Sequence, residues 1–231
     1  MPDTREVWRT TRMRDRVAAA AYDFGVERES VATLGGRLMW STDAGLLFRS
    51  IRRLHEVPDG SQILDLPCGG GVALRGLTRE QRVRYVAADL SPFMLARAKE
   101  TARRLGLEQV EFCEADVESL PFAGGEFDLI LTYSGLHCFP DPARALRELA
   151  RCLRPGGLMR GDCAVRGARP QSDLLIALYQ RLGIFGSGGT LTDVDRWIEH
   201  AGLEYTSRTV SGAVLFFEAR IGETSSRRTA T

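Results

Sequence analysis

An apolar run passes directly into a glycine-rich loop in Ile63-Leu64-Asp65-Leu66-Pro67-Cys68-Gly69-Gly70-Gly71. The run before the loop has the length and character of a buried strand. Glycine has no side chain, so the loop backbone can approach a ligand closely. Because doubly wound sheets bind ligands at the carboxyl ends of their strands, this segment predicts a first strand followed by a ligand-binding loop.

The chain after this loop predicts alternating strands and helices, with strands over 83–88, 110–114, 127–132 and 158–163 and helices over 72–79, 93–105 and 142–153. This alternation is typical of a parallel sheet with helices on both faces. Two more strands, 204–210 and 213–221, meet at Ser211-Gly212, which is a signal for an antiparallel hairpin. We therefore predict a doubly wound α/β fold with a mostly parallel, seven-stranded sheet and an antiparallel C-terminal hairpin.

The segments outside this core predict additions to it. Helical composition over 5–22 and 42–56 indicates that residues 1–60 form a helical N-terminal cap, followed by the main domain over 61–221. The alternation lapses over residues 166–190, where a helix over 172–182 precedes a glycine-rich loop, and a helix over 193–201 follows. We expect 166–190 to be an insertion that helps to build the acceptor site, and the small polar residues of 222–231 to be a flexible tail.

The composition excludes several classes of protein. Thirty-one basic residues balance 30 acidic ones in the 231-residue chain, for a net charge of +1, which argues against a partner bound through nucleic-acid phosphates. The five cysteines are odd in number and lack any CxxC pair, so we predict reduced thiols, a cytoplasmic location and no metal site. No apolar run approaches the roughly 18 residues of a membrane span.

Acidic residues follow three successive predicted strands. Asp65 and Asp89 end the first and second strands, and Asp116 lies just beyond the third. A carboxylate can receive a cationic group, the hydroxyls of a ribose or an adenine amino group. Three acids at one edge of the sheet suit a cationic nucleoside and are a poor match for a pyrophosphate.

These segments resemble the class I S-adenosylmethionine-dependent methyltransferases, most closely the small-molecule branch that includes the ubiquinone and menaquinone biosynthesis enzymes. The resemblance covers roughly residues 60–165, in five motifs: Ile63–Gly71, Ala88–Ser91, Ala115–Val117 together with Leu120–Phe122, Phe127–Ile130, and Leu153–Gly157. One such motif would be weak, whereas five in order at fitting distances are specific. The resemblance implies a Rossmann-like methyltransferase domain, with S-adenosyl-L-methionine as cofactor and S-adenosyl-L-homocysteine as product.

The resemblance also implies roles for individual positions. Asp65 and the loop of Pro67, Cys68 and Gly69–Gly71 would surround the methionine portion of the cofactor. Asp89 would bind the ribose, Leu90 would pack beside the adenine, and Asp116 with Val117 would contact the edge of the adenine. Thr132 and Tyr133 would lie near the methyl donor, and Tyr22 would fold over the cofactor. Pro67 stands where the family has its first glycine, so we expect altered loop detail with binding retained.

Two residues after the fourth strand are candidates for catalysis. His137 has a side chain that ordinarily titrates near neutral pH, so it suits a proton acceptor, and a packing role is the alternative. Tyr133 is a second candidate because it ends the strand beside the loop. Cys138 has no evident activating partner for a nucleophilic role. Arg160 falls in a strand that should be buried, so it needs a partner, of which an anionic substrate group is one.

The sequence therefore predicts methyl transfer, by in-line displacement, to a small and largely apolar metabolite of quinone, polyketide or lipid type. The alternative is a protein of the same fold that binds S-adenosylmethionine without transferring its methyl group, as a cyclase-like enzyme or a sensor. A nicotinamide-dependent oxidoreductase fits less well, because the third glycine of its GxGxxG motif falls on Leu74. Nucleic-acid methylation is the weakest candidate.

Overall fold

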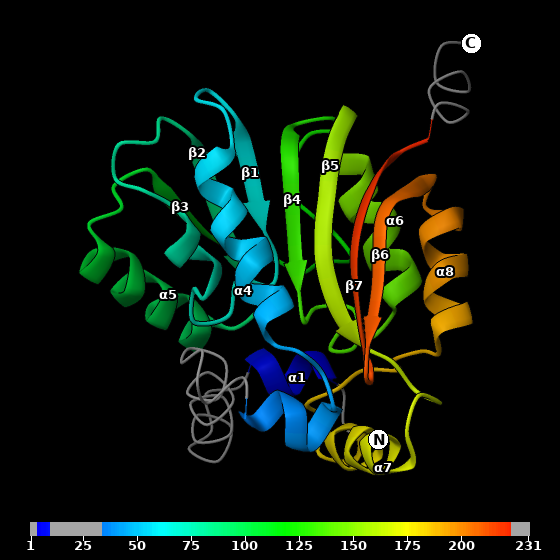
Figure 1. Ribbon diagram of the computed structural model, residues 1–231. Coiled ribbons are helices and arrows are strands. Elements are labelled where there is room, and N and C mark those ends of the chain that lie inside the picture. Colours follow the sequence, from blue (N-terminus) through cyan, green and yellow to red (C-terminus); the bar gives the residue numbers. More distant parts are fainter. Residues whose placement is uncertain (1–3, 10–33, 223–231) are drawn as a thin grey trace.

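The computed structural model describes residues 4–9 and 34–222. Its seven-stranded sheet has the order β3-β2-β1-β4-β5-β7-β6 (Figure 1). The strands are β1 Gln62–Asp65, β2 Arg84–Asp89, β3 Val110–Glu114, β4 Phe127–Tyr133, β5 Leu153–Ala164, β6 Leu203–Ser211 and β7 Val214–Ile221. Neighbours from β3 to β5 pair in parallel, and β7 is antiparallel to both β5 and β6. The predicted fold class is confirmed.

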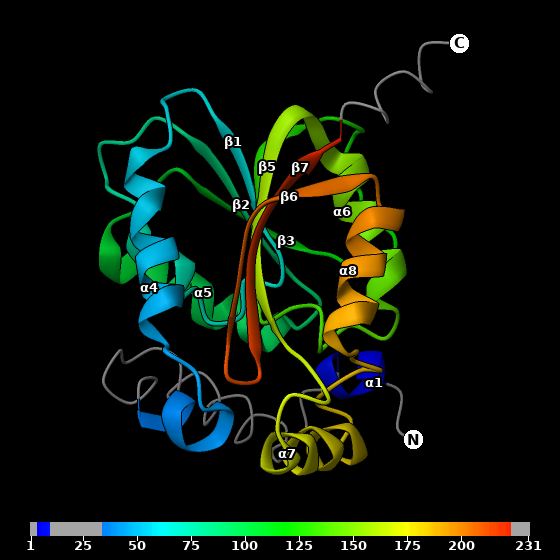
Figure 2. The same ribbon diagram turned by 45° about the vertical axis from the view of Figure 1, so that its right-hand side comes forward.

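Helices cover both faces of the sheet (Figure 2). On one face, α4 (Gly45–Arg52) and α5 (Pro92–Leu105) bury Ile51 and Leu95 against β1 and β2. On the other, α6 (Pro142–Cys152) and α8 (Leu191–His200) bury Leu146 and Ile198. The central strands are thus buried on both sides, which is why their sequences are continuously apolar.

Helix caps set the positions of the elements next to the carboxyl ends of the strands. Ser91 accepts a hydrogen bond from the Met94 backbone N–H and begins α5, while Gly106 ends that helix in the left-handed conformation. Asp141 caps α6 by accepting from the N–H of Arg144. Proline occupies the first position of both helices, where its missing N–H has no intrahelical partner to lose.

Three smaller elements lie beyond the carboxyl ends of the parallel strands, in both views of the ribbon (Figures 1 and 2). These are α1 (Thr4–Arg9), the π-helical turn η1 (Gly36–Trp40) and α7 (Pro170–Arg181). A 3₁₀ turn, η2 (Arg53–Glu56), extends α4 towards β1. In the part of the chain that the structure describes, no helix is long and apolar enough to cross a membrane.

Three sequence predictions need correction. The helix predicted over 72–79 is only the 3₁₀ turn η3 (Ala73–Gly76), and Gly76 packs so closely on α4 that a side chain there would meet the Ile51 carbonyl oxygen. The turn predicted before the fifth strand lies within β5, as a bulge around Gly156. The hairpin turn is Gly212-Ala213, one residue later than predicted, because Ser211 still pairs with Val214.

Candidate functional site

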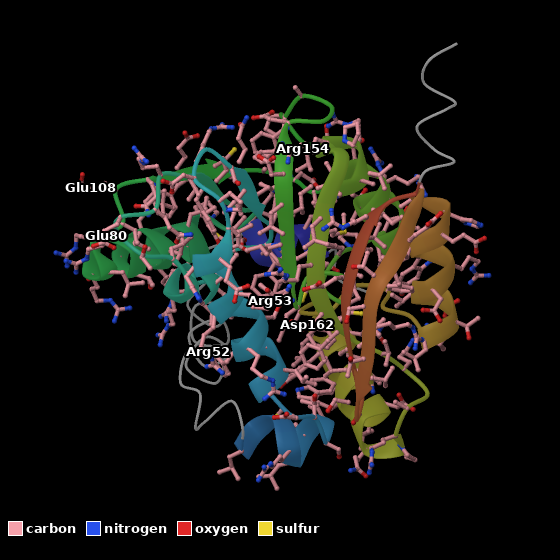
Figure 3. The ribbon with its side chains drawn as sticks, turned by 45° about the horizontal axis from the view of Figure 1, so that its top comes forward. Arg52, Arg53, Glu80, Glu108, Arg154 and Asp162 are labelled. Atoms are coloured by element: carbon pink, nitrogen blue, oxygen red, sulfur yellow. The ribbon has the colours of Figure 1, made fainter. Side chains whose placement is uncertain are left out.

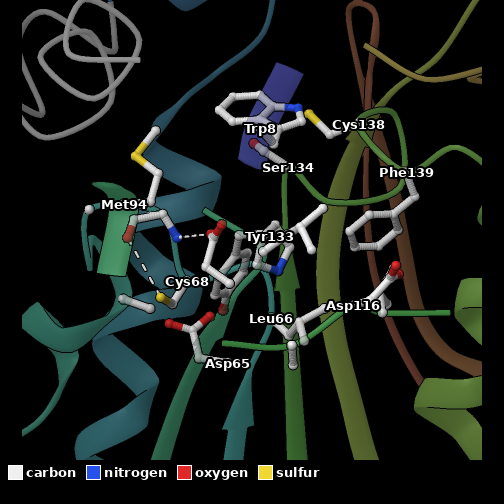
Figure 4. A pocket seen from close by; sticks show the side chains of 18 of the residues that line it. Trp8, Asp65, Leu66, Cys68, Met94, Asp116, Tyr133, Ser134, Cys138 and Phe139 are labelled. Atoms are coloured by element: carbon white, nitrogen blue, oxygen red, sulfur yellow. Dashed lines mark hydrogen bonds between the residues drawn. The ribbon is translucent and has the colours of Figure 1, made fainter. Parts of the chain in front are cut away.

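A cavity opens at the carboxyl ends of β1, β2, β3 and β4, with about 1050 Å³ of space including its mouth (Figure 4). Strand order reverses between β1 and β4, which is where open α/β sheets bind ligands. Of the residues that the sequence analysis proposed for the site, those lining the cavity are Asp65, Pro67, Cys68, Gly69, Asp89, Leu90, Asp116, Val117 and Tyr133. One cavity therefore brings together most of the proposed site.

The glycine loop follows β1 and forms one wall. Gly69 and Gly71 have φ values of 51° and 85°, in the left-handed region that favours glycine. Gly71 does not line the cavity: a side chain there would come within 2.7 Å of Leu74 and 3.3 Å of the Ala98 backbone. Its role is close packing of the loop on α5, and Gly69 and Gly70 present backbone to the cavity.

Asp89 connects the glycine loop to the start of α5. One carboxylate oxygen accepts from the N–H of Gly69 at 3.0 Å, and the other accepts from the N–H of Ser91 at 2.9 Å. Asp89 also lines the cavity, and a carboxylate accepts several hydrogen bonds, so it is placed to accept from a ligand hydroxyl. The residue is thus both a loop organiser and a candidate for the ribose.

Asp65 is buried beneath the loop at the end of β1. The Tyr85 hydroxyl donates to it at 2.8 Å. The pKa of Asp65 is raised to about 7, chiefly by burial; the Tyr85 hydrogen bond opposes the shift, and the nearby Asp89 carboxylate adds to it. A cationic ligand group beside Asp65 would favour its ionised form.

Asp116 is ion-paired with the N-terminal helix. Its Oδ2 lies 3.2 Å from Arg5 Nε and 3.6 Å from Arg9 Nη2, and its Oδ1 accepts from the N–H of Glu118. Arg5 also pairs with the buried Glu118 carboxylate. Helix α1 therefore closes the side of the cavity where an adenine edge was expected.

Trp8 is a cavity residue that the sequence analysis missed. It lines the cavity from α1, and its indole N–H donates to the Ile184 carbonyl at 3.2 Å. Figure 4 shows it on the same side of the cavity as Ser134 and Cys138. A tryptophan in an otherwise polar helix is the only sequence signal for this role, and no pattern there predicts contact with residue 184.

Residues 166–190 touch the site only indirectly. Among the described cavity-lining residues none comes from this segment, which reaches the cavity through the Trp8–Ile184 hydrogen bond. Leu174, Leu178 and Leu182 are 75%, 49% and 48% exposed, so they are surface residues and not core. Ile176 and Phe185 anchor the segment instead.

Tyr133 lies in the cavity wall, and its hydroxyl is 2.7 Å from the Ser50 hydroxyl on α4. Burial raises the pKa of Tyr133 well above its usual range, so the phenol is neutral at physiological pH. Arg160, on the neighbouring strand β5, has the partner that its burial requires in Glu218, with 2.9 Å between Arg160 Nε and the carboxylate. An anionic substrate group is not needed to explain it.

His137 does not fit the proton-acceptor role. Its side chain is buried outside the cavity lining, and its Nδ1 accepts from the N–H of Ala164 at 3.0 Å. The ring packs edge-on against Phe185, and burial lowers the pKa of His137 to about 3. An imidazole with an occupied acceptor nitrogen and this pKa is a packing residue, which was the alternative reading of His137.

Two other proposed residues are not found in the cavity lining. Thr132 is fully buried beneath Gly135 and Gly161 and does not line the cavity, because its side chain points into the packing between β4 and β5. Tyr22 lies outside the described residues.

Asp162, on β5, is a second functional candidate that the sequence analysis missed. It is 4% exposed, and Figure 3 shows it within the body of the fold, whereas Glu80 and Glu108 lie at the outer edge. The Ser134 hydroxyl donates to its Oδ1 at 3.2 Å. Its signal was present in the sequence, since a carboxylate inside an apolar strand is costly unless it has a function or a partner.

The fold, the glycine loop and the acids at three strand ends are the features expected of the class I S-adenosylmethionine-dependent methyltransferase type. The residues fit that cofactor: Asp65 for a cation, Asp89 for ribose hydroxyls and Gly69-Gly70 for close backbone approach. Residues 63–157 match the family model described as a methyltransferase domain, which supports S-adenosylmethionine as the cofactor.

Similarity to individual proteins agrees with this class. The chain is 33% identical over 169 residues to methyltransferase GfsG of Streptomyces halstedii, covering 70% of this chain and 60% of that protein. It is 45% identical over 105 residues to the demethylmenaquinone methyltransferase of Thermus thermophilus, covering 45% of this chain and 46% of that protein. The chain thus spans about half the length of these relatives.

A solved structure, that of the cyclase SpnF, has the same fold. Its TM-score is 0.64 at 20% identity, over 81% of this chain and 84% of that one.

Proposed function

We propose that this protein transfers the methyl group of S-adenosylmethionine to a small, largely apolar metabolite. The observation that carries the proposal is the convergence of Asp65, Asp89 and the Gly69 backbone on one cavity inside a methyltransferase domain. When bound, S-adenosylmethionine supplies a methyl group that is already activated by its positive sulfur. The protein's contribution is therefore chiefly to align the reactants and exclude water.

The residues of the chain divide the work of binding. The pKa of Asp65 is raised to about 7, chiefly by burial, so a neighbouring cation would favour its ionised form. Asp65 therefore suits the ammonium group of the methionine portion. Asp89 lines the cavity at the end of β2 and suits the ribose hydroxyls. Leu90 and Val117 offer apolar contacts for the adenine. Asp116 contacts the adenine edge by sharing its carboxylate with Arg5 of α1 or after Arg5 is displaced.

The acceptor is proposed to be apolar because of apolar side chains in the cavity lining. Trp8, Leu47, Cys138 and Phe139 are among them. The relative named demethylmenaquinone methyltransferase supports a quinone-like or lipid-like acceptor. The five cysteines are all free, which supports a reducing compartment such as the cytoplasm.

The test is transfer of label from methyl-labelled S-adenosylmethionine. The protein is incubated with it and with an organic extract of the source organism, and labelled products are separated and identified. We expect one labelled apolar product and stoichiometric S-adenosylhomocysteine. The likeness to a cyclase of the same fold supports the alternative, a protein that binds S-adenosylmethionine without consuming it. An acceptor that rearranges while the label stays on S-adenosylmethionine would establish that alternative.

A further inference from the structure

Ser134 occupies an unusual backbone position at the edge of the cavity. It follows β4, lines the cavity, and has a φ of 53°, which is uncommon for a residue other than glycine. This conformation directs both of its donors at Asp162: the backbone N–H to the carbonyl at 3.1 Å and the hydroxyl to Oδ1 at 3.2 Å. Strained backbone that persists in a fold is a feature of functional sites.

Asp162 has an unused oxygen in this arrangement. Its Oδ2 is buried and has no hydrogen-bond partner. A buried carboxylate oxygen without a partner is destabilising, so its retention calls for an explanation. The nearest cation on the same strand, Arg160, is paired with Glu218 and therefore does not neutralise Asp162.

The surroundings of Asp162 set its protonation. The titratable groups that face it are Tyr133 on β4, Cys138 on the following loop and Cys163 on β5, and burial raises the pKa of all three above their usual range. These neighbours are therefore uncharged at neutral pH. Burial raises the pKa of Asp162 itself to about 7, which suits a group that must take up a proton and release it again.

We propose that Ser134 and Asp162 form the proton-accepting pair of this enzyme, and that the acceptor is a hydroxyl compound. The inference rests on the methyl transfer proposed above. As the acceptor oxygen bonds to the methyl carbon, the carbon–sulfur bond breaks and its electron pair stays on sulfur. The acceptor's proton passes to Ser134 Oγ, whose own proton moves to Asp162. The neutral Asp162 acid then returns its proton to water.

The geometry assigns different roles to the two residues. Ser134 is catalytic, because its hydroxyl lies in the cavity wall within reach of an acceptor. Asp162 acts through Ser134, since it does not line the cavity itself. His137, the other candidate for this proton, is excluded by its position and its hydrogen bond to Ala164.

The test compares Asp162→Asn and Ser134→Gly with wild type. Glycine removes the hydroxyl but suits the left-handed backbone, so Ser134→Gly should fold with an equal or higher Tm. Both variants should transfer label from methyl-labelled S-adenosylmethionine about 100-fold more slowly at pH 7.5, with affinity for S-adenosylhomocysteine unchanged within about twofold. Asp195→Asn is the control, because that carboxylate serves Tyr205 and Arg208 on another part of the fold.

Two further readouts separate a proton role from a structural one. Wild-type transfer at saturating S-adenosylmethionine should rise with pH through about 7, and this limb should vanish in Asp162→Asn. Carbon-13 NMR of carboxyl-labelled protein, with no cofactor added, should show two aspartate signals titrating near pH 7, those of Asp65 and Asp162, of which only one remains in that variant. If both variants keep the wild-type rate and pH profile, the proposed proton-accepting pair is wrong and the proposed function stands. If the wild type transfers no label, the proposed function and the pair are both wrong.

Discussion

Arg5 and Asp116 form an ion pair across the mouth of the cavity, with 3.2 Å between Arg5 Nε and Asp116 Oδ2. The pair places α1 over the side of the cavity where the adenine is proposed to lie, and the Trp8–Ile184 hydrogen bond holds the same helix from its other end. A ligand that uses the Asp116 carboxylate must therefore share it with α1 or displace Arg5.

Loosening α1 should speed the release of the cofactor product. We expect Arg5→Gln to raise the dissociation rate of S-adenosylhomocysteine about two- to fivefold, because a partly exposed ion pair contributes up to about 1 kcal/mol. Stopped-flow displacement measures this rate. Arg144→Gln is the matched control, since Arg144 pairs with Glu118 but not with Asp116. Equal effects in the two variants would contradict a covering role for α1.

Removal of the Asp89 carboxylate should weaken cofactor binding. Asp89→Ala is expected to cost about 1–3 kcal/mol of binding free energy, the range for hydrogen bonds to a charged group. Calorimetric titration with S-adenosylhomocysteine measures it. Asp141→Ala is the control, because Asp141 also accepts from a backbone N–H at a helix N-terminus but lies outside the cavity lining. This variant should lower Tm and leave the affinity for S-adenosylhomocysteine unchanged. Unchanged affinity in Asp89→Ala would refute the ribose assignment.

Cofactor affinity should depend on pH through Asp65. Its pKa is raised to about 7, so protonation below pH 7 removes the negative charge that a cationic ligand needs. We expect affinity for S-adenosylhomocysteine to fall about tenfold between pH 7.5 and 6 in wild type. Asp65→Asn should bind more weakly at pH 7.5 and lose most of this dependence. A pH-independent wild type would show that Asp65 does not contact the ligand's ammonium.

His137 should affect the pH dependence of stability. Its folded pKa is lowered to about 3, while an unfolded histidine titrates near 6.5. Below pH 6.5 the unfolded state binds the extra proton, so this group makes the fold less stable as pH falls. Between pH 7 and 5, wild type should lose about 2 kcal/mol more unfolding free energy than His137→Asn, as measured by denaturant titration. Parallel curves would contradict the burial of a neutral imidazole.

The parallel core was predictable because each of its strands is buried on both faces, so a continuous apolar run ending in a turn marks it. Ser91 and Gly106 likewise predicted where α5 begins and ends. The turn around Gly156 and the short η3 were mispredicted because tertiary packing decides them: β4 keeps pairing past the bulge, and Gly76 is held against α4.

The residues of the candidate site could be predicted where they lie at or just beyond the carboxyl end of a strand. Asp65, Asp89 and Asp116 each follow a strand, so the topology alone brings them together. Contacts between distant segments, such as Trp8 with Ile184, leave no local pattern in the sequence. The sequence left both a proton-accepting and a packing role open for His137, because its place after β4 does not show that the chain turns it towards Ala164 and Phe185.

The central claim is that the cavity at the strand ends is an S-adenosylmethionine site. Calorimetric titration of the wild-type protein with S-adenosylmethionine tests it most directly, with NADH as the competing ligand of a related sheet. We predict saturable binding of S-adenosylmethionine at one site per chain, and no binding of NADH. Tight binding of NADH without binding of S-adenosylmethionine would contradict the account.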